Sequence, residues 1–75
     1  MEEELSAKEL SGLLDHFLDT LSQENRVLFM RRYWYADSIG DIAKRMNLRD
    51  NNVSVRLLRI RRKLKRYLKK EGYEI

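Results

Sequence analysis

An apolar stripe in the last third of the chain constrains the fold more than any other feature. Its members are separated by one, three or four residues and are Val53, Leu57, Ile60, Leu64, Tyr67 and Leu68. At 100° per residue they occupy about one third of a helical wheel, which is the pattern of an amphipathic α-helix. A long helix of this kind needs its stripe covered, so the rest of the chain must supply apolar partners.

The remaining sequence predicts further helices joined by short turns. The chain has no proline and three glycines among its 75 residues, and few such breakers favour helix. The fold class that we expect is all-α, a four- to five-helix bundle in a single domain over residues 1–75, with residues 1–5 disordered. The expected helices run from Ser6 to Thr20, from the Ser22 cap to Tyr33, from Ile39 to Met46, and from Asp50 to Lys70.

Several helix ends carry recognisable signals. Ser22 and Ser38 are expected to cap the second and third helices, and Asp50 to cap the last one. Asn47 tolerates the left-handed conformation that ends many helices. Gly72 stands where a C-terminal cap would lie.

The aromatic residues between the second and third helices are predicted to belong to the core. We expect Val27, Leu28, Met30 and Trp34 to point inward. On this interpretation Trp34 fills the space between helices, with Tyr33 and Tyr35 at its edge. Stacking of Trp34 on nucleic-acid bases is the less favoured alternative.

Composition excludes several kinds of site. With no cysteine and one histidine, the chain offers no disulfide, no thiolate metal site and little basis for a zinc centre or histidine catalysis. We expect His16 on the outer face of the first helix. The longest uncharged runs have five residues, so no membrane span or signal peptide is expected. So small a chain rarely builds a catalytic pocket, and we expect a non-enzymatic protein without metal or cofactor.

Charge is distributed unevenly along the chain. Residues 1–25 carry seven acids and one base, whereas residues 49–75 carry ten bases and three acids. Nine lysines or arginines fall within residues 56–70, and no acid compensates them. Such a segment repels itself, which favours a polyanionic partner and hence binding to duplex DNA.

The segment from Ser38 to Leu57 has the spacing of a helix-turn-helix, within a unit that we place at about residues 38–70. Ala43 is the small residue where two helices cross closely, Asn47 is the turn, and Val53 seals the second helix against Ile42. The second helix could then enter a DNA major groove with its N-terminal residues at the base edges. An ordinary helical hairpin is the alternative.

This geometry yields candidate DNA contacts. An aliphatic side chain can meet a thymine methyl group, and an arginine can bind a guanine edge. The predicted base-contacting residues are Asn51, Ser54, Val55, Leu58 and Arg59. The predicted phosphate-contacting residues are basic and are Arg31, Arg32, Lys44, Arg45, Arg56, Arg61, Arg62 and Lys63.

Three segments carry a family resemblance, and they run from Phe17 to Phe29, from Arg31 to Ala43, and from Val53 to Leu64. Through them the sequence from Leu10 to Gly72 resembles region 4 of the sigma-70 class of bacterial RNA polymerase sigma factors, most closely the small, extracytoplasmic-function-like ones. The chain departs from the family pattern in having Asn47 at the turn, Arg49 where a serine or threonine usually caps the next helix, and Val55 beside Ser54.

The resemblance implies recognition of the promoter −35 element by a cytoplasmic, nucleoid-associated bacterial protein. It also implies docking on the flap of the polymerase β subunit through apolar surface of the first two helices. The family's base-contacting positions align with residues 54, 55, 58 and 59, and an anti-sigma factor is a further partner to consider. A sigma factor needs a separate region 2, so we expect a fragment or a lone domain.

Two alternatives remain at this stage. One is the helix-turn-helix output domain of a response regulator, which shares the four-helix plan. The other is a basic amphipathic module for a protein or membrane surface. The latter is disfavoured because the stripe is needed to close the core against Leu13, Phe17 and Val27, and we expect no membrane partner.

Overall fold

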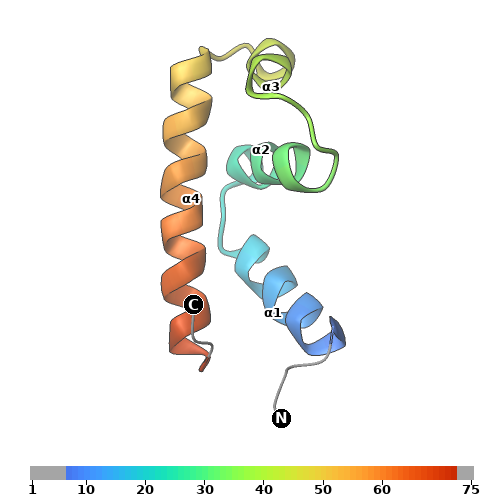
Figure 1. Cartoon of the computed structure of the whole chain (residues 1–75), viewed down its shortest axis with the longest axis vertical. Coiled ribbons are helices and arrows are strands. Elements are labelled where there is room, and N and C mark those ends of the chain that lie inside the picture. Colours follow the sequence, from blue (N-terminus) through green and yellow to red (C-terminus); the bar gives the residue numbers. More distant parts are fainter. Residues whose placement is uncertain (1–6, 73–75) are drawn as a thin grey trace.

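The computed structural model describes residues 7–72, and that part of the chain is helical without strands. The expected disorder of residues 1–5 concerns positions outside this range. The elements are α1 (Ala7–Asp19), α2 (Gln23–Tyr33), α3 (Ile39–Met46) and α4 (Asp50–Lys70). Figure 1 shows α4 as a long upright helix, with α3, α2 and α1 following one another alongside it. The all-α prediction is confirmed, as are the predicted bounds of the last three helices. The first helix ends at Asp19 rather than at the predicted Thr20, and its predicted start at Ser6 lies outside the described residues.

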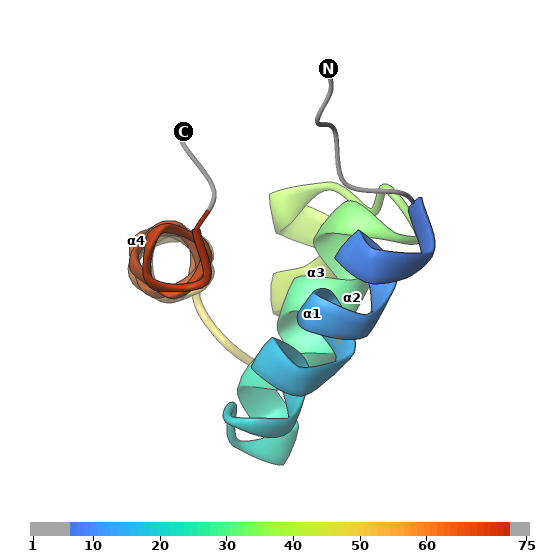
Figure 2. The same cartoon turned by 90° about the horizontal axis from the view of Figure 1, so that it is seen from below.

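The apolar stripe of α4 is the common packing surface of the other helices. Val53, Leu57 and Ile60 are buried, and Leu64 and Tyr67 are half-buried against the same core. The view along α4 in Figure 2 places α1, α2 and α3 all on one side of it. The rest of the helix surface is therefore left to charged and polar residues.

The predicted caps of α2 and α3 are present. The Ser22 hydroxyl accepts a hydrogen bond from the backbone N–H of Asn25 at 3.2 Å, and Ser38 accepts one from Asp41 at 3.0 Å. Both bonds satisfy an N–H group that lacks a partner within its helix.

The turn between α3 and α4 depends on one left-handed residue. Asn47 has φ 57° and ψ 47°, as predicted. With the chain turned in this way, the Leu48 N–H reaches the Ala43 carbonyl at 2.8 Å, which satisfies an acceptor at the end of α3. Gly72 likewise follows the end of α4 with φ 99°.

The predicted cap of α4 is wrong. The N-cap is Arg49, which makes no side-chain capping bond, and Asp50 is already the first helical residue. The Asp50 carboxylate still lies in the first turn, where the helix dipole favours a negative charge.

The predicted aromatic filling of the core is also wrong. Trp34 is 75% exposed, and Tyr33, Tyr35 and Val27 are exposed as well. Since α2 ends at Tyr33 and Ala36 takes a positive φ of 60°, the chain turns away from the core directly after Trp34. On α2 itself, Leu28 takes the buried position, and the neighbouring Val27 points about 100° away from it.

The core aromatic residue is Phe17 instead. Its ring lies 5.5 Å from that of Tyr67 and 6.5 Å from that of Phe29, measured between centroids. These three residues join α1, α2 and α4 around the end of the core away from α3.

The corner between α1 and α2 is held by an arginine that the sequence did not single out. The half-buried Arg26 donates from Nε to the Leu18 carbonyl at 3.1 Å and from Nη2 to the Leu21 carbonyl at 3.5 Å. Leu18 lies in the last turn of α1 and Leu21 just beyond the end of that helix, where carbonyl groups lack partners within the helix. Arg26 thus fixes α1 to the start of α2.

The left-handed conformation of Asn47 leads to a testable prediction about the stability of the fold. We expect Asn47→Val to lower the free energy of unfolding by about 1–2 kcal/mol, because a side chain other than glycine or asparagine is strained at this φ. Asn47→Gly should be neutral or slightly stabilising. Urea denaturation followed by circular dichroism measures both. The exposed helical control Asn52→Val should change stability by less than about 0.5 kcal/mol, and an equal loss in this control would contradict the explanation.

Candidate nucleic-acid interface

The α3–α4 pair forms the predicted helix-turn-helix. Ala43 and Ile42 are buried on α3, and Val53 is buried on the facing side of α4. A side chain larger than Ala43 at this crossing would push the two helices apart. The seal fixes how the first turns of α4 project from the domain, and this projection decides whether they can enter a groove.

The predicted base-contacting residues lie on the first two and a half turns of α4, outside the buried stripe. Asn51, Ser54, Leu58 and Arg59 are exposed, whereas Val55 is half-buried. Within the described range the side chains of the three polar ones make no hydrogen bond or ion pair. Three of the five border a polar depression of about 450 Å³, which is lined by Arg49, Asn51, Asn52, Val55, Arg56 and Arg59.

The predicted phosphate-contacting residues fall into two groups. The first group is exposed and makes no polar contact in the part of the chain that the structure describes; it consists of Lys44, Arg45, Arg62 and Lys63. Two of them occupy the last turn of α3 and two the middle of α4. Such side chains are available for a polyanion without losing an internal partner.

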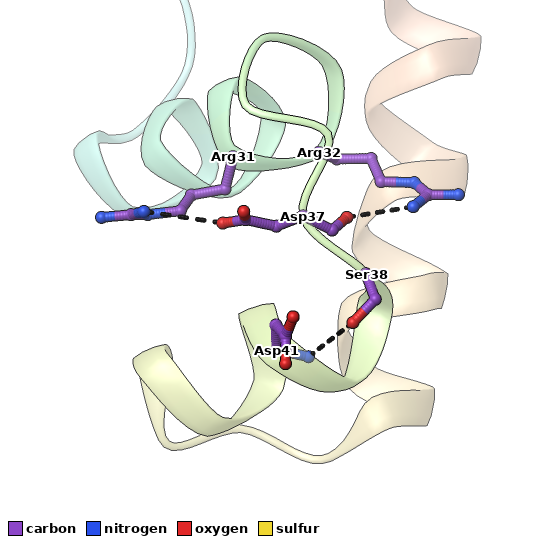
Figure 3. Close-up of polar contacts among 5 residues, drawn as sticks. All are labelled: Arg31, Arg32, Asp37, Ser38 and Asp41. Carbon is purple, nitrogen blue, oxygen red and sulfur yellow. Dashed lines mark hydrogen bonds and ion pairs between the residues drawn. The ribbon is translucent and has the colours of Figure 1, made fainter.

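The second group has partners within the fold. Arg31 lies 3.5 Å from Oδ2 of Asp37, and its guanidinium carbon is 5.5 Å from the centre of the Tyr35 ring. Arg32 donates to the Asp37 backbone carbonyl at 3.0 Å. Figure 3 shows both arginines reaching from α2 to opposite ends of Asp37, just before the Ser38 cap of α3.

These contacts hold the link between α2 and α3. Asp37 Oδ2 is buried and accepts no hydrogen bond, so Arg31 acts on it through charge alone. The Asp37 N–H donates to the Arg31 carbonyl at 2.9 Å, which closes the turn from the backbone side. Arg31 and Arg32 therefore have a structural task that their charge did not reveal.

Two arginines of α4 are also paired. Arg61 donates to the Tyr33 hydroxyl at 2.6 Å, and Arg56 forms a hydrogen-bonded ion pair with Glu24 of α2. Arg56 borders a second polar depression of about 370 Å³, which is lined by Ser22, Asn25, Arg56, Arg59, Ile60 and Lys63.

A separate apolar groove of about 500 Å³ runs between α1, α2 and α4. Its lining consists of Ser11, Leu14, Asp15, Leu18, Phe29, Met30, Tyr33, Trp34, Arg61 and Leu64. The exposed Trp34 belongs to its wall, so the aromatic residue missing from the core contributes to a surface groove. The resemblance implied apolar surface on the first two helices, and this groove is formed by those helices together with α4.

Other kinds of site find no support in residues 7–72. His16 is exposed, as predicted. Among those residues no group of histidine, cysteine, aspartate and glutamate could hold a metal ion. The helices of this range are all too short or too polar to cross a membrane.

A helix-turn-helix with an outward, basic second helix defines the class of DNA-binding helix-turn-helix domains. Comparison with protein-family models goes further, because the model described as "Sigma-70, region 4" matches residues 11–64, most of the chain. The chain belongs to the sigma-70 region 4 family. Searches of curated proteins and of solved structures returned no significant match. Family membership favours the sigma interpretation over a response-regulator output domain.

The exposure of Trp34 can be tested by comparing two aromatic truncations. We expect Trp34→Ala to change the free energy of unfolding by less than about 0.5 kcal/mol, because its side chain is mostly in water. Phe17→Ala should cost about 3–5 kcal/mol, because it leaves a cavity in the core. Chemical denaturation of both variants is the measurement. A comparable loss in the two would place Trp34 in the core after all.

Proposed function

We propose that this chain is the promoter-binding module of a sigma factor and recognises the −35 element through the first turns of α4. The observation that carries the proposal is the set of unpartnered residues Asn51, Ser54 and Arg59 on an exposed helix face, in a chain of the sigma-70 region 4 family. Leu58 is exposed beside them and suits a thymine methyl group. This role is one of binding rather than catalysis.

The phosphate contacts in this proposal come chiefly from the lysine and arginine side chains that have no partner within the described fold. Lys44 and Arg45 at the end of α3 and Arg62 and Lys63 on α4 flank the base-reading face. Four contacts correspond to a slope of about −3.6 for log K against log salt. Duplex binding should therefore be steeply salt dependent, and duplex should be preferred over single strands.

Base readout is tested with Arg59→Ala. If Arg59 binds a guanine edge, its loss should cost about 1–3 kcal/mol on a duplex selected for tight binding and much less on a scrambled duplex. Arg66→Ala is the matched control, since Arg66 is exposed further along α4 and should affect both duplexes about equally or neither. Titrations at one salt concentration compare the two variants. Equal losses on both duplexes for Arg59→Ala would reduce the residue to a phosphate contact.

The second part of the proposal is docking on the β-subunit flap of RNA polymerase through the apolar groove. Leu14, Leu18, Phe29 and Leu64 line the groove, and Trp34 offers a large exposed anchor of the type that dominates protein interfaces. Apart from Arg61, the groove shares no residue with the predicted DNA contacts. The domain could thus bind DNA and polymerase at the same time. We place this binding in the bacterial cytoplasm. An anti-sigma factor would compete for the same surfaces.

Docking is tested by binding of the chain to core polymerase. Because truncation of a central aromatic anchor often costs 2 kcal/mol or more, we expect Trp34→Ala to weaken this binding by about 30-fold. Its affinity for duplex DNA should stay within about twofold, since Trp34 lies outside the proposed DNA face. The control His16→Ala, on the exposed side of α1, should leave both affinities unchanged. Unaltered polymerase binding by Trp34→Ala would remove the groove from the proposal.

A further inference from the structure

The ion pair between Glu24 and Arg56 joins the acidic first half of the chain to its basic last helix. Glu24 stands in the first turn of α2, and Arg56 stands in the second turn of α4. Their carboxylate and guanidinium groups are hydrogen-bonded. The Arg56 side chain is 30% exposed and that of Glu24 is 50% exposed, so water and ions reach the pair.

Packing of the two helices holds these side chains in position. Leu28 lies one turn after Glu24 on α2 and is fully buried, and Leu57 directly follows Arg56 and is buried as well. The backbones that carry the two charges are therefore fixed relative to each other by the core. Because folding has already ordered both helices, the ion pair loses less conformational entropy than a pair between mobile surface side chains.

Arg56 also occupies the middle of a basic strip on α4. Asn52, Arg56, Arg59 and Lys63 follow one another at intervals of four, three and four residues, so they share one side of the helix. Arg56 and Arg59 both border the two polar depressions, which lie on either side of them. An uncommitted guanidinium at position 56 would thus stand one turn before the unpaired Arg59, on the same side of the helix as Lys63, and could meet the same DNA strand.

We infer that Glu24 is an internal counter-ion that keeps Arg56 out of phosphate contact and thereby limits the affinity of α4 for DNA. The inference rests on the proposed DNA binding and deepens it. A carboxylate bound to Arg56 cancels one positive charge of the strip, and phosphate contacts are the sequence-independent part of binding. Glu24 thus lowers attachment to any duplex without touching the base-reading residues.

The inference changes the role predicted for Arg56. Its charge and its place on α4 suggested a phosphate contact, whereas the ion pair makes it a positioning residue between α2 and α4. Unlike Lys63, Arg56 would then not release a counterion from DNA when the chain binds.

The test is the salt dependence of binding to a duplex of random sequence, which needs no knowledge of the promoter. In Glu24→Gln the carboxylate is lost and Arg56 becomes available, so the slope of log K against log salt should steepen by about 0.9. At 0.1 M salt one added contact corresponds to about eightfold tighter binding. The double variant Glu24→Gln/Arg56→Gln should return to the slope of the unmodified chain.

The matched control is Glu71→Gln, which removes the same charge at the far end of α4. Fifteen residues separate positions 56 and 71, which is about 22 Å along a helix. At salt concentrations whose screening length is about 10 Å or less, this change should leave the slope unaltered. Circular dichroism verifies that each variant keeps its helix content.

Three results would overturn the inference. The first is an unchanged slope in Glu24→Gln. The second is an equal effect of Glu71→Gln, which would reduce Glu24 to a contribution to net charge. The third is a slope about 0.9 shallower in Arg56→Gln alone, because Arg56 would then already contact phosphate beside an intact Glu24. If the unmodified chain binds no duplex even at low salt, the proposed DNA binding fails together with the inference. If the unmodified chain binds duplex but one of the three results is found, only the inference about Glu24 fails.

Discussion

Burial of the apolar stripe of α4 is the interaction on which the rest of this small structure depends. Val53, Leu57 and Ile60 are buried beneath α2 and α3, and Tyr67 extends the contact to Phe17 on α1. Short helices are only marginally stable by themselves in water and need such a surface to pack on. Since the stripe faces one side only, the opposite side of α4 is free to carry charge, and structure and binding are divided between the two faces of a single helix.

The arginines show how a basic chain divides its charge between folding and binding. Arg26 holds the corner between α1 and α2, and Arg31 and Arg32 hold the link between α2 and α3 through Asp37. The guanidinium groups that make these internal contacts are therefore less available to DNA than the number of basic residues suggests. Among the side chains that the structure describes, the cations without internal partners gather at the end of α3 and along α4, where the helix-turn-helix would place a duplex.

Local features were predictable because each depends on neighbours in sequence. The serine caps at positions 22 and 38 need only an N–H group three residues on, and Asn47 needs only its own tolerance of a positive φ. The heptad-like stripe of α4 likewise follows from spacing alone. The cap of α4 was not predictable in this way: Arg49 occupies the N-cap without a side-chain capping bond, and Asp50, the predicted cap, is already the first helical residue.

The sequence by itself determined the fold class, the helices, the turn of the helix-turn-helix and the side of α4 that faces the core. These features depend on hydrophobic periodicity and capping, which involve only residues close together in the sequence. Only the tertiary structure decided that Trp34 lies outside the core and borders a groove, because that depends on where α1 and α4 end up relative to the end of α2. It also decided which arginines are paired. Glu24 and Arg56 are 32 positions apart in the sequence, and packing alone brings their charges together.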